Sequence, residues 1–180
     1  MESSSTITNR LNELKKLILE AKRFLNSDNN KTLEYARKAL TEAIELQEPT
    51  AIVEAYTLIG QGQMLCGEHT AADISIESAL KIAEKHRLSF QEKTLRVYVA
   101  VLHQFKGELD IAKELLLKEL DGANHQFLPT IYNNLGIISG EKKDYKDSLS
   151  WFTKAREMRE KEGRMDYAAG LMTNQSEMLL

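Results

Sequence analysis

The sequence predicts an all-α protein built from antiparallel pairs of helices that follow one another along the chain. Leu, Ala, Glu and Lys, which favour helices, are abundant, and apolar residues recur at spacings of three and four rather than alternating. Only 9 Gly and 2 Pro occur among 180 residues, about half the usual share. The chain therefore lacks the turn residues that many short strands would need.

Small residues recur at regular intervals and reveal an internal repeat. One series runs in steps of 40, 36 and 40 residues through Gly60, Ala100, Gly136 and Ser176. A second series runs in steps of 36, 40 and 36 through Ala36, Ala72, Ala112 and Ser148. Each member of the second series from Ala72 onward follows a member of the first series by 12 residues. Two series in fixed phase indicate a repeated helical hairpin, because small side chains let paired helices approach closely.

Bulky residues and turn segments complete each copy of the hairpin. Four positions after each member of the second series, on the same helical face, stand Leu40, Ile76, Leu116 and Phe152. Turn segments begin at Cys66, Lys106 and Glu141, and two of them contain Gly near the expected end of a helix. The pattern predicts helices at residues 6–26, 32–48, 50–66, 70–86, 90–105, 109–120, 129–139, 145–161 and 166–180. The first copy, which contains Ala21, needs about three extra loop residues at 26–30.

These residues resemble the tetratricopeptide repeat family, whose signature combines an aromatic residue, Leu-Gly, and an Ala followed four positions later by a large residue. The best copy consists of Tyr132, Leu135, Gly136, Tyr145, Ser148, Phe152 and Ala155. A second good copy consists of Tyr56, Ile59, Gly60, Gly67, Ala72, Ile76 and Ala79. The copy around Ala100 is weaker, because Arg96 replaces the aromatic residue and Glu119 replaces the last Ala. The resemblance implies a right-handed superhelical solenoid of about four repeats plus a final unpaired helix, forming one domain over residues 1–180.

The resemblance also implies where a partner binds. In such solenoids the first helices of successive hairpins line a concave surface, and the groove residues flank the small residue of each first helix. This rule selects Thr57, Leu58, Gln61, Val97, Tyr98, Val101, Asn133, Asn134, Ile137 and Asn174, with Thr173 and Glu177 beside Asn174. Asn carboxamides both donate and accept, so they suit a peptide backbone. The alternative interpretation is that the Asn side chains are merely solvated or cap-like.

One subtype of the family grips a terminal carboxylate with a Lys and an Asn in the first hairpin and with further Lys and Arg in the third. The corresponding positions here hold Ile18 and Lys22, then Val97 and Val101. That clamp is absent, which disfavours binding of a chaperone tail and leaves other peptides as partners.

Composition disfavours nucleic-acid and membrane partners. The 24 basic and 27 acidic residues, with a formal charge of -3, are mixed along the chain and leave no clustered basic patch. No apolar run approaches the roughly 18 residues needed to cross a bilayer. The first five residues lack the pattern of a secretion signal, and the single Cys66 builds no internal disulfide. We therefore expect a cytoplasmic protein.

Catalytic and metal-binding patterns are absent from the sequence. The scattered residues His69, His86, His103 and His125 form no short metal-binding pair. Cys66 and His69 are three residues apart, but no third group that would orient them is evident. No Gly-rich phosphate loop occurs. We expect no catalytic residue, metal or cofactor; the alternative is an enzyme with an unrecognised site in the groove.

The last predicted helix, at 166–180, starts a hairpin and ends on the apolar residues Met178, Leu179 and Leu180. Terminal repeats usually need a polar outer face. We therefore expect either a fragment of a longer protein, which we favour, or self-association through this helix. Repeats of this length resemble the input regions of bacterial regulators. The leading hypothesis is a protein- or peptide-binding module that serves as a scaffold or as the sensory part of a regulator.

Overall fold

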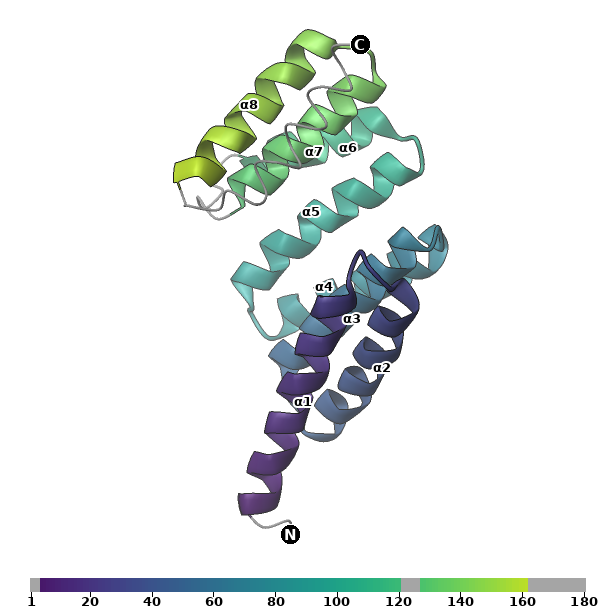
Figure 1. Cartoon of the computed structure of the whole chain (residues 1–180), viewed down its shortest axis with the longest axis vertical. Helices are drawn as coiled ribbons and strands as arrows, with labels where there is room; N and C mark the ends of the chain where they lie inside the picture. The colour runs from purple at the N-terminus through teal and green to yellow at the C-terminus, as the bar shows by residue number, and fades with distance from the viewer. Residues whose placement is uncertain (1–3, 121–126, 162–180) are drawn as a thin grey trace. The chain divides into compact units, whose positions relative to one another are not determined.

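The computed structural model describes residues 4–120 and 127–161, and every regular element in these ranges is an α-helix (Figure 1). The helices are α1 (Ser4–Phe24), α2 (Asn29–Glu45), α3 (Pro49–Leu65), α4 (His69–Lys85), α5 (Ser89–Phe105), α6 (Leu109–Leu120), α7 (Leu128–Glu141) and α8 (Tyr145–Lys161). The prediction of an all-α chain is confirmed, and each of these helices begins and ends within three residues of its predicted bounds. The predicted helix at 166–180 lies outside the described residues.

The chain divides into two compact units, Met1–Leu102 and His103–Leu180, which we describe separately. In the first unit, α2 packs on α1 and α3, α3 packs on α4, and α1 also touches α3. Leu95 and Leu102 of α5 share a buried core with residues of α3 and α4. In the second unit, α7 packs on α8 and on α6. The expectation of one domain over residues 1–180 stays a prediction.

The small residues of the first series lie where paired helices cross closely. A Cβ on Gly60 of α3 would lie 2.6 Å from Cδ1 of Ile76 on α4, and one on Gly136 of α7 would lie 2.8 Å from the ring of Phe152 on α8. Both distances are shorter than carbon atoms tolerate, so a larger residue at either position would force its neighbour to shift. The predicted crossing of helices at small residues is thus confirmed in both pairs.

The second series of small residues is completely buried. Ala36, Ala72, Ala112 and Ser148 are all 0% exposed. The Ser148 hydroxyl donates a hydrogen bond of 2.7 Å to the carbonyl oxygen of Gly136. A buried polar group that has a partner avoids most of the cost of losing water, which explains why Ser replaces Ala in the last copy.

Among the described residues, five helices end in the same kind of turn. The turn residue has a positive φ at Gln47, Gly67, Arg87, Gly107 and Lys143, with values between 54° and 78°. The N–H of the following residue donates to a carbonyl five positions back, as Glu68 does to Gln63 at 2.8 Å and Leu88 to Ala83 at 2.9 Å. This is the Schellman arrangement, which glycine fits best. The first four turns are spaced 20 residues apart, and this spacing sets the period of the repeat.

The turn between α1 and α2 differs from the prediction. Residues 26–30 were expected to form an extended loop, but α2 already begins at Asn29. Asp28 caps the helix by accepting a hydrogen bond of 3.1 Å from the N–H of Lys31, and this bond is the main cause that holds the pKa of Asp28 below 3.8. The turn has four residues, 25–28, one more than the turns that follow α2, α3 and α4, while α2 has 17 residues, as α3, α4 and α5 do.

Gly60→Ala should destabilise the protein by about 1–3 kcal/mol, because the new methyl group overlaps the end of the Ile76 side chain. Adding Ile76→Val removes the nearest atom, so the double variant should lose less free energy of unfolding than the two single variants together. Urea unfolding of the four proteins measures this coupling. Purely additive losses would contradict the proposed contact.

Arg87→Gly should stabilise the protein by about 0.5–1 kcal/mol, because it relieves a side chain held at positive φ. Gly67→Ala should destabilise it by a similar amount, since no atom lies within 4 Å of the added Cβ and only the backbone is strained. As a control, Lys85→Gly in the last turn of α4 should destabilise by up to about 1 kcal/mol. The free energy of unfolding is measured by chemical denaturation. If Arg87→Gly lowers it as Lys85→Gly does, Arg87 is not a residue strained by positive φ.

Candidate functional site

The first unit contains a groove between the first helices of three successive pairs, α1, α3 and α5. Its cavity has a volume of ≈ 250 Å³. It is lined by Lys22 of α1, by Thr50, Val53, Glu54, Thr57, Leu58 and Gln61 of α3, and by Phe90, Gln91, Thr94, Leu95 and Tyr98 of α5. We call this surface the α1–α3–α5 groove.

The floor of the groove is aliphatic. Val53 and Leu95 are 1% exposed and Leu58 is 3% exposed. Two of these side chains come from α3, which lies between α2 and α4 and therefore buries residues on more than one face. The floor of the groove is thus positioned by packing in the core.

The walls of the groove carry uncharged polar groups. The Gln61 carboxamide on α3 donates a hydrogen bond to the phenolic oxygen of Tyr98 on α5. The Thr57 hydroxyl donates to the carbonyl oxygen of Val53 at 2.7 Å, within its own helix. This hydroxyl oxygen keeps acceptor capacity, as does the Gln61 carbonyl. The walls therefore combine donors and acceptors above an apolar floor.

An ion pair and an aromatic ring stand at the mouth of the groove. The Lys22 ammonium on α1 lies 2.5 Å from a carboxylate oxygen of Glu54 on α3, and the two side chains are 52% and 36% exposed. Phe90, at the start of α5, is 48% exposed. An exposed aromatic side chain beside a groove is typical of a contact that a partner covers.

The structure brings together four of the residues selected from the sequence. Thr57, Leu58, Gln61 and Tyr98 all line the groove. Val97, 4% exposed, and the partly buried Val101 do not line it. Val101 packs against the core formed by α3, α4 and α5.

The remaining selected residues belong to the second unit. The Asn134 carboxamide donates to the carbonyl oxygen of Thr130 at 2.9 Å, within α7. Ile137 packs against the core formed by Phe152 and Ala155, and Asn133 is partly buried. Asn174, with Thr173 and Glu177, lies outside the described residues. The role of these residues in binding stays a prediction.

The selection from the sequence missed more than half of the groove lining. Phe90 and Thr94 precede Tyr98 by eight and four residues, and Thr50 and Glu54 precede Leu58 by the same intervals. Residues four apart share a helical face. Extending the selection backwards along α3 and α5 by whole turns would have found them. Lys22 follows Ala21 as Gln61 follows Gly60, so applying the selection rule to the first copy would have found it as well.

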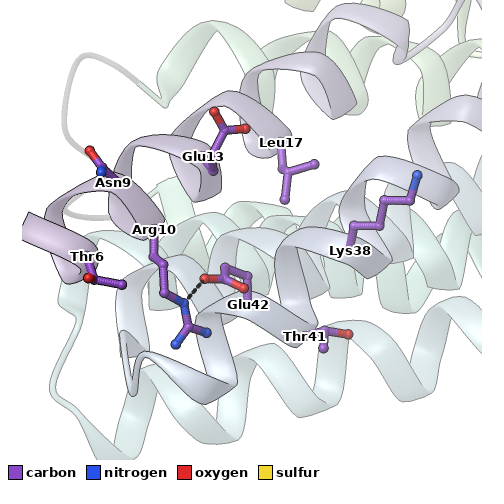
Figure 2. Close-up of a pocket in the computed structure, with 8 residues that line it drawn as sticks. All are labelled: Thr6, Asn9, Arg10, Glu13, Leu17, Lys38, Thr41 and Glu42. Carbon is purple, nitrogen blue, oxygen red and sulfur yellow. Dashed lines mark hydrogen bonds and ion pairs between the residues drawn. The ribbon is translucent and has the colours of Figure 1, made fainter. Parts of the chain in front are cut away.

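A second cavity, of ≈ 650 Å³, lies between α1 and α2 and is wide open to solvent (Figure 2). Arg10 points toward Glu42 and donates to it at 2.6 Å, and it also pairs with Glu45 at 2.5 Å. Lys38 is bonded to Glu34 at 2.6 Å, and this hydrogen bond raises the pKa of Lys38 above 10.5. Both cations that line this cavity therefore have carboxylate partners.

The structure also bears on the thiol, on metal binding and on membrane insertion. Cys66 is exposed at the corner between α3 and α4. Within residues 4–120 and 127–161, no group of three or more His, Cys, Asp or Glu side chains is arranged to hold a metal ion. None of the helices in these ranges is long and apolar enough to cross a membrane.

Comparisons with known proteins found solved structures of similar fold. No protein-family model matches the sequence, and no curated protein sequence matches it. The structure of the apo form of RapI has a TM-score of 0.69 and 16% identity over 89% of this chain. BtubC from P. vanneervenii has a TM-score of 0.64 and 20% identity, covering 98% of this chain and 84% of BtubC. MamA has a TM-score of 0.50 and 17% identity, covering 91% of this chain and 99% of MamA.

The chain therefore has the fold of the tetratricopeptide-type helical repeat proteins, a solenoid of antiparallel helix pairs. This finding agrees with the predicted fold class. The chain spans 60% of the length of RapI.

Tyr98→Phe should destabilise the protein by about 0.5–1.5 kcal/mol, because the Gln61 carboxamide loses its acceptor. Once Gln61→Leu is present, the same change should cost less, since no donor remains to be satisfied. The free energy of unfolding in urea measures both effects. Equal costs of Tyr98→Phe in the two backgrounds would contradict a stabilising bond across the groove.

Proposed function

We propose that the protein is a non-catalytic module that binds a segment of another protein or a peptide in the α1–α3–α5 groove. The observation that carries this proposal is the cavity itself, which lies where the first helices of successive pairs converge. Repeat solenoids use such surfaces to bind extended segments. An apolar floor with polar walls suits a peptide, which presents side chains and a hydrogen-bonding main chain together.

The groove also contains the kinds of residue that are typical of a binding hot spot. Phe90 and Tyr98 are aromatic residues that lie, partly exposed, next to buried aliphatic side chains. Aromatic residues at the edge of an apolar pocket dominate the free energy of many protein interfaces. We also propose that the other residues selected from the sequence contact the bound peptide: Val97, Val101, Asn133, Asn134, Ile137 and Asn174.

We further propose that the module acts as a scaffold or as the sensory part of a larger regulator, and that it works in the cytoplasm. The mixed surface charge supports a protein partner rather than a nucleic acid. Self-association through residues 166–180 concerns a segment outside the described residues and stays a prediction.

Phe90→Ala should weaken peptide binding by about tenfold, because it removes an exposed ring from the groove. The probes are peptides selected from a phage-displayed random library on the immobilised wild-type protein, and fluorescence anisotropy measures their dissociation constants. Thermal unfolding should change little, since the ring is half exposed.

Phe105→Ala is the matched control. Phe105 lies on the same helix and is also 48% exposed, but it does not line the groove. The selected peptides should bind this variant as they bind the wild type. A library that yields no binder, or binders that lose equal affinity with both variants, would refute binding in this groove. Asn134→Ala tests the wider set of contacts in the same assay.

A further inference from the structure

The charges of the α1–α3–α5 groove cancel. Among the twelve residues that line it, Lys22 and Glu54 are the only charged ones, and they contact each other at 2.5 Å. The pair joins α1 to α3 at the mouth of the cavity. A ligand that enters therefore meets neither an unpaired cation nor an unpaired anion among the lining side chains.

The other lining residues favour an uncharged apolar side chain. The floor consists of Val53, Leu58 and Leu95, and the polar walls consist of hydroxyl and carboxamide groups. A charged side chain that entered would lose water without gaining an opposite charge, which is strongly unfavourable. An aliphatic side chain would instead bury apolar surface against apolar surface.

The size of the cavity limits its occupant to a small group. Its ≈ 250 Å³ is below the roughly 300–1,000 Å³ of pockets that enclose drug-sized ligands. One side chain with its adjoining main chain fits this size better than a nucleotide or a cofactor does. The Gln61 carbonyl and the Thr57 hydroxyl can accept hydrogen bonds from main-chain N–H groups.

We propose that the groove selects a neutral aliphatic side chain, of the size of Leu or Met, from an extended peptide, and that the Lys22–Glu54 pair sets this preference by cancelling charge at the mouth. This inference rests on the proposed function and specifies the ligand of the same site. The pair acts on specificity, because either residue alone would leave a charge that attracts an opposite side chain.

Three acetylated and amidated pentapeptides, Gly-Ser-Xaa-Ser-Gly with Leu, Asp or Lys at the centre, test the preference. The readout is the change in methyl NMR signals of Val53, Leu58 and Leu95 at one fixed peptide concentration. The leucine peptide should shift these signals at least about tenfold more than the charged peptides. Equal shifts from all three peptides, a larger shift from a charged one, or no shift from the leucine peptide would overturn the preference.

Glu54→Gln should leave the Lys22 ammonium unpaired and increase the shift caused by the aspartate peptide by about fivefold. Lys22→Gln should do the same for the lysine peptide. Glu42→Gln is the matched control, because it removes a carboxylate from Arg10 in the same unit but outside the groove. If neither groove variant changes the order of the peptides, the pair does not set specificity.

The two proposals fail in different ways. If library peptides bind the wild type and ignore Phe90→Ala, the proposed binding site is wrong. If they depend on Phe90 but the charged pentapeptides shift the groove signals as much as the leucine peptide does, the binding site stands and the ligand preference is wrong.

Discussion

The close approach of paired helices is the constraint on which the rest of the structure depends. At Gly60 and at Gly136 the missing side chain lets a bulky residue of the partner helix, Ile76 or Phe152, lie against the backbone. The two bulky side chains are completely buried as a result. Because interiors are packed at nearly crystalline density, a hairpin held in this way has one preferred crossing. Repeating the crossing along the sequence repeats the geometry.

The turns extend this local geometry along the chain and place successive first helices beside one groove. Four left-handed residues at intervals of 20 place one helix and one turn in each interval, so every second helix occupies an equivalent position. In the first unit these equivalent helices are α1, α3 and α5, which line one cavity. The groove is thus a consequence of the repeat. Its chemistry is independent of the repeat, because lining residues such as Thr94 and Tyr98 are not the small residues that the crossings need.

The sequence was sufficient to predict the fold because crossings and turns depend on residue types at fixed spacing. It was less informative about the groove. The rule of selecting neighbours of a small residue worked on α3, but on α5 it selected Val97, which is buried, along with Tyr98, which lines the cavity. Successive residues of a helix point about 100° apart, so neighbours of one position reach different surroundings. The ion pair between Lys22 and Glu54 joins residues 32 apart, and its existence depends on how α1 is rotated against α3.

In the proposed mode of binding, the Lys22–Glu54 ion pair matters more for the choice of ligand than for stability. Exposed pairs contribute about 0–1 kcal/mol to folding, because water already solvates both charges and the side chains lose freedom when they pair. Lys22 and Glu54, 52% and 36% exposed, fall in this class, while buried contacts such as that of Gly60 hold the hairpins together. A ligand would displace water from the mouth of the groove, so the charges of the ion pair would be screened less. Under the proposed preference, the pair then determines whether an entering side chain meets a net charge, and its main effect is on which ligand binds.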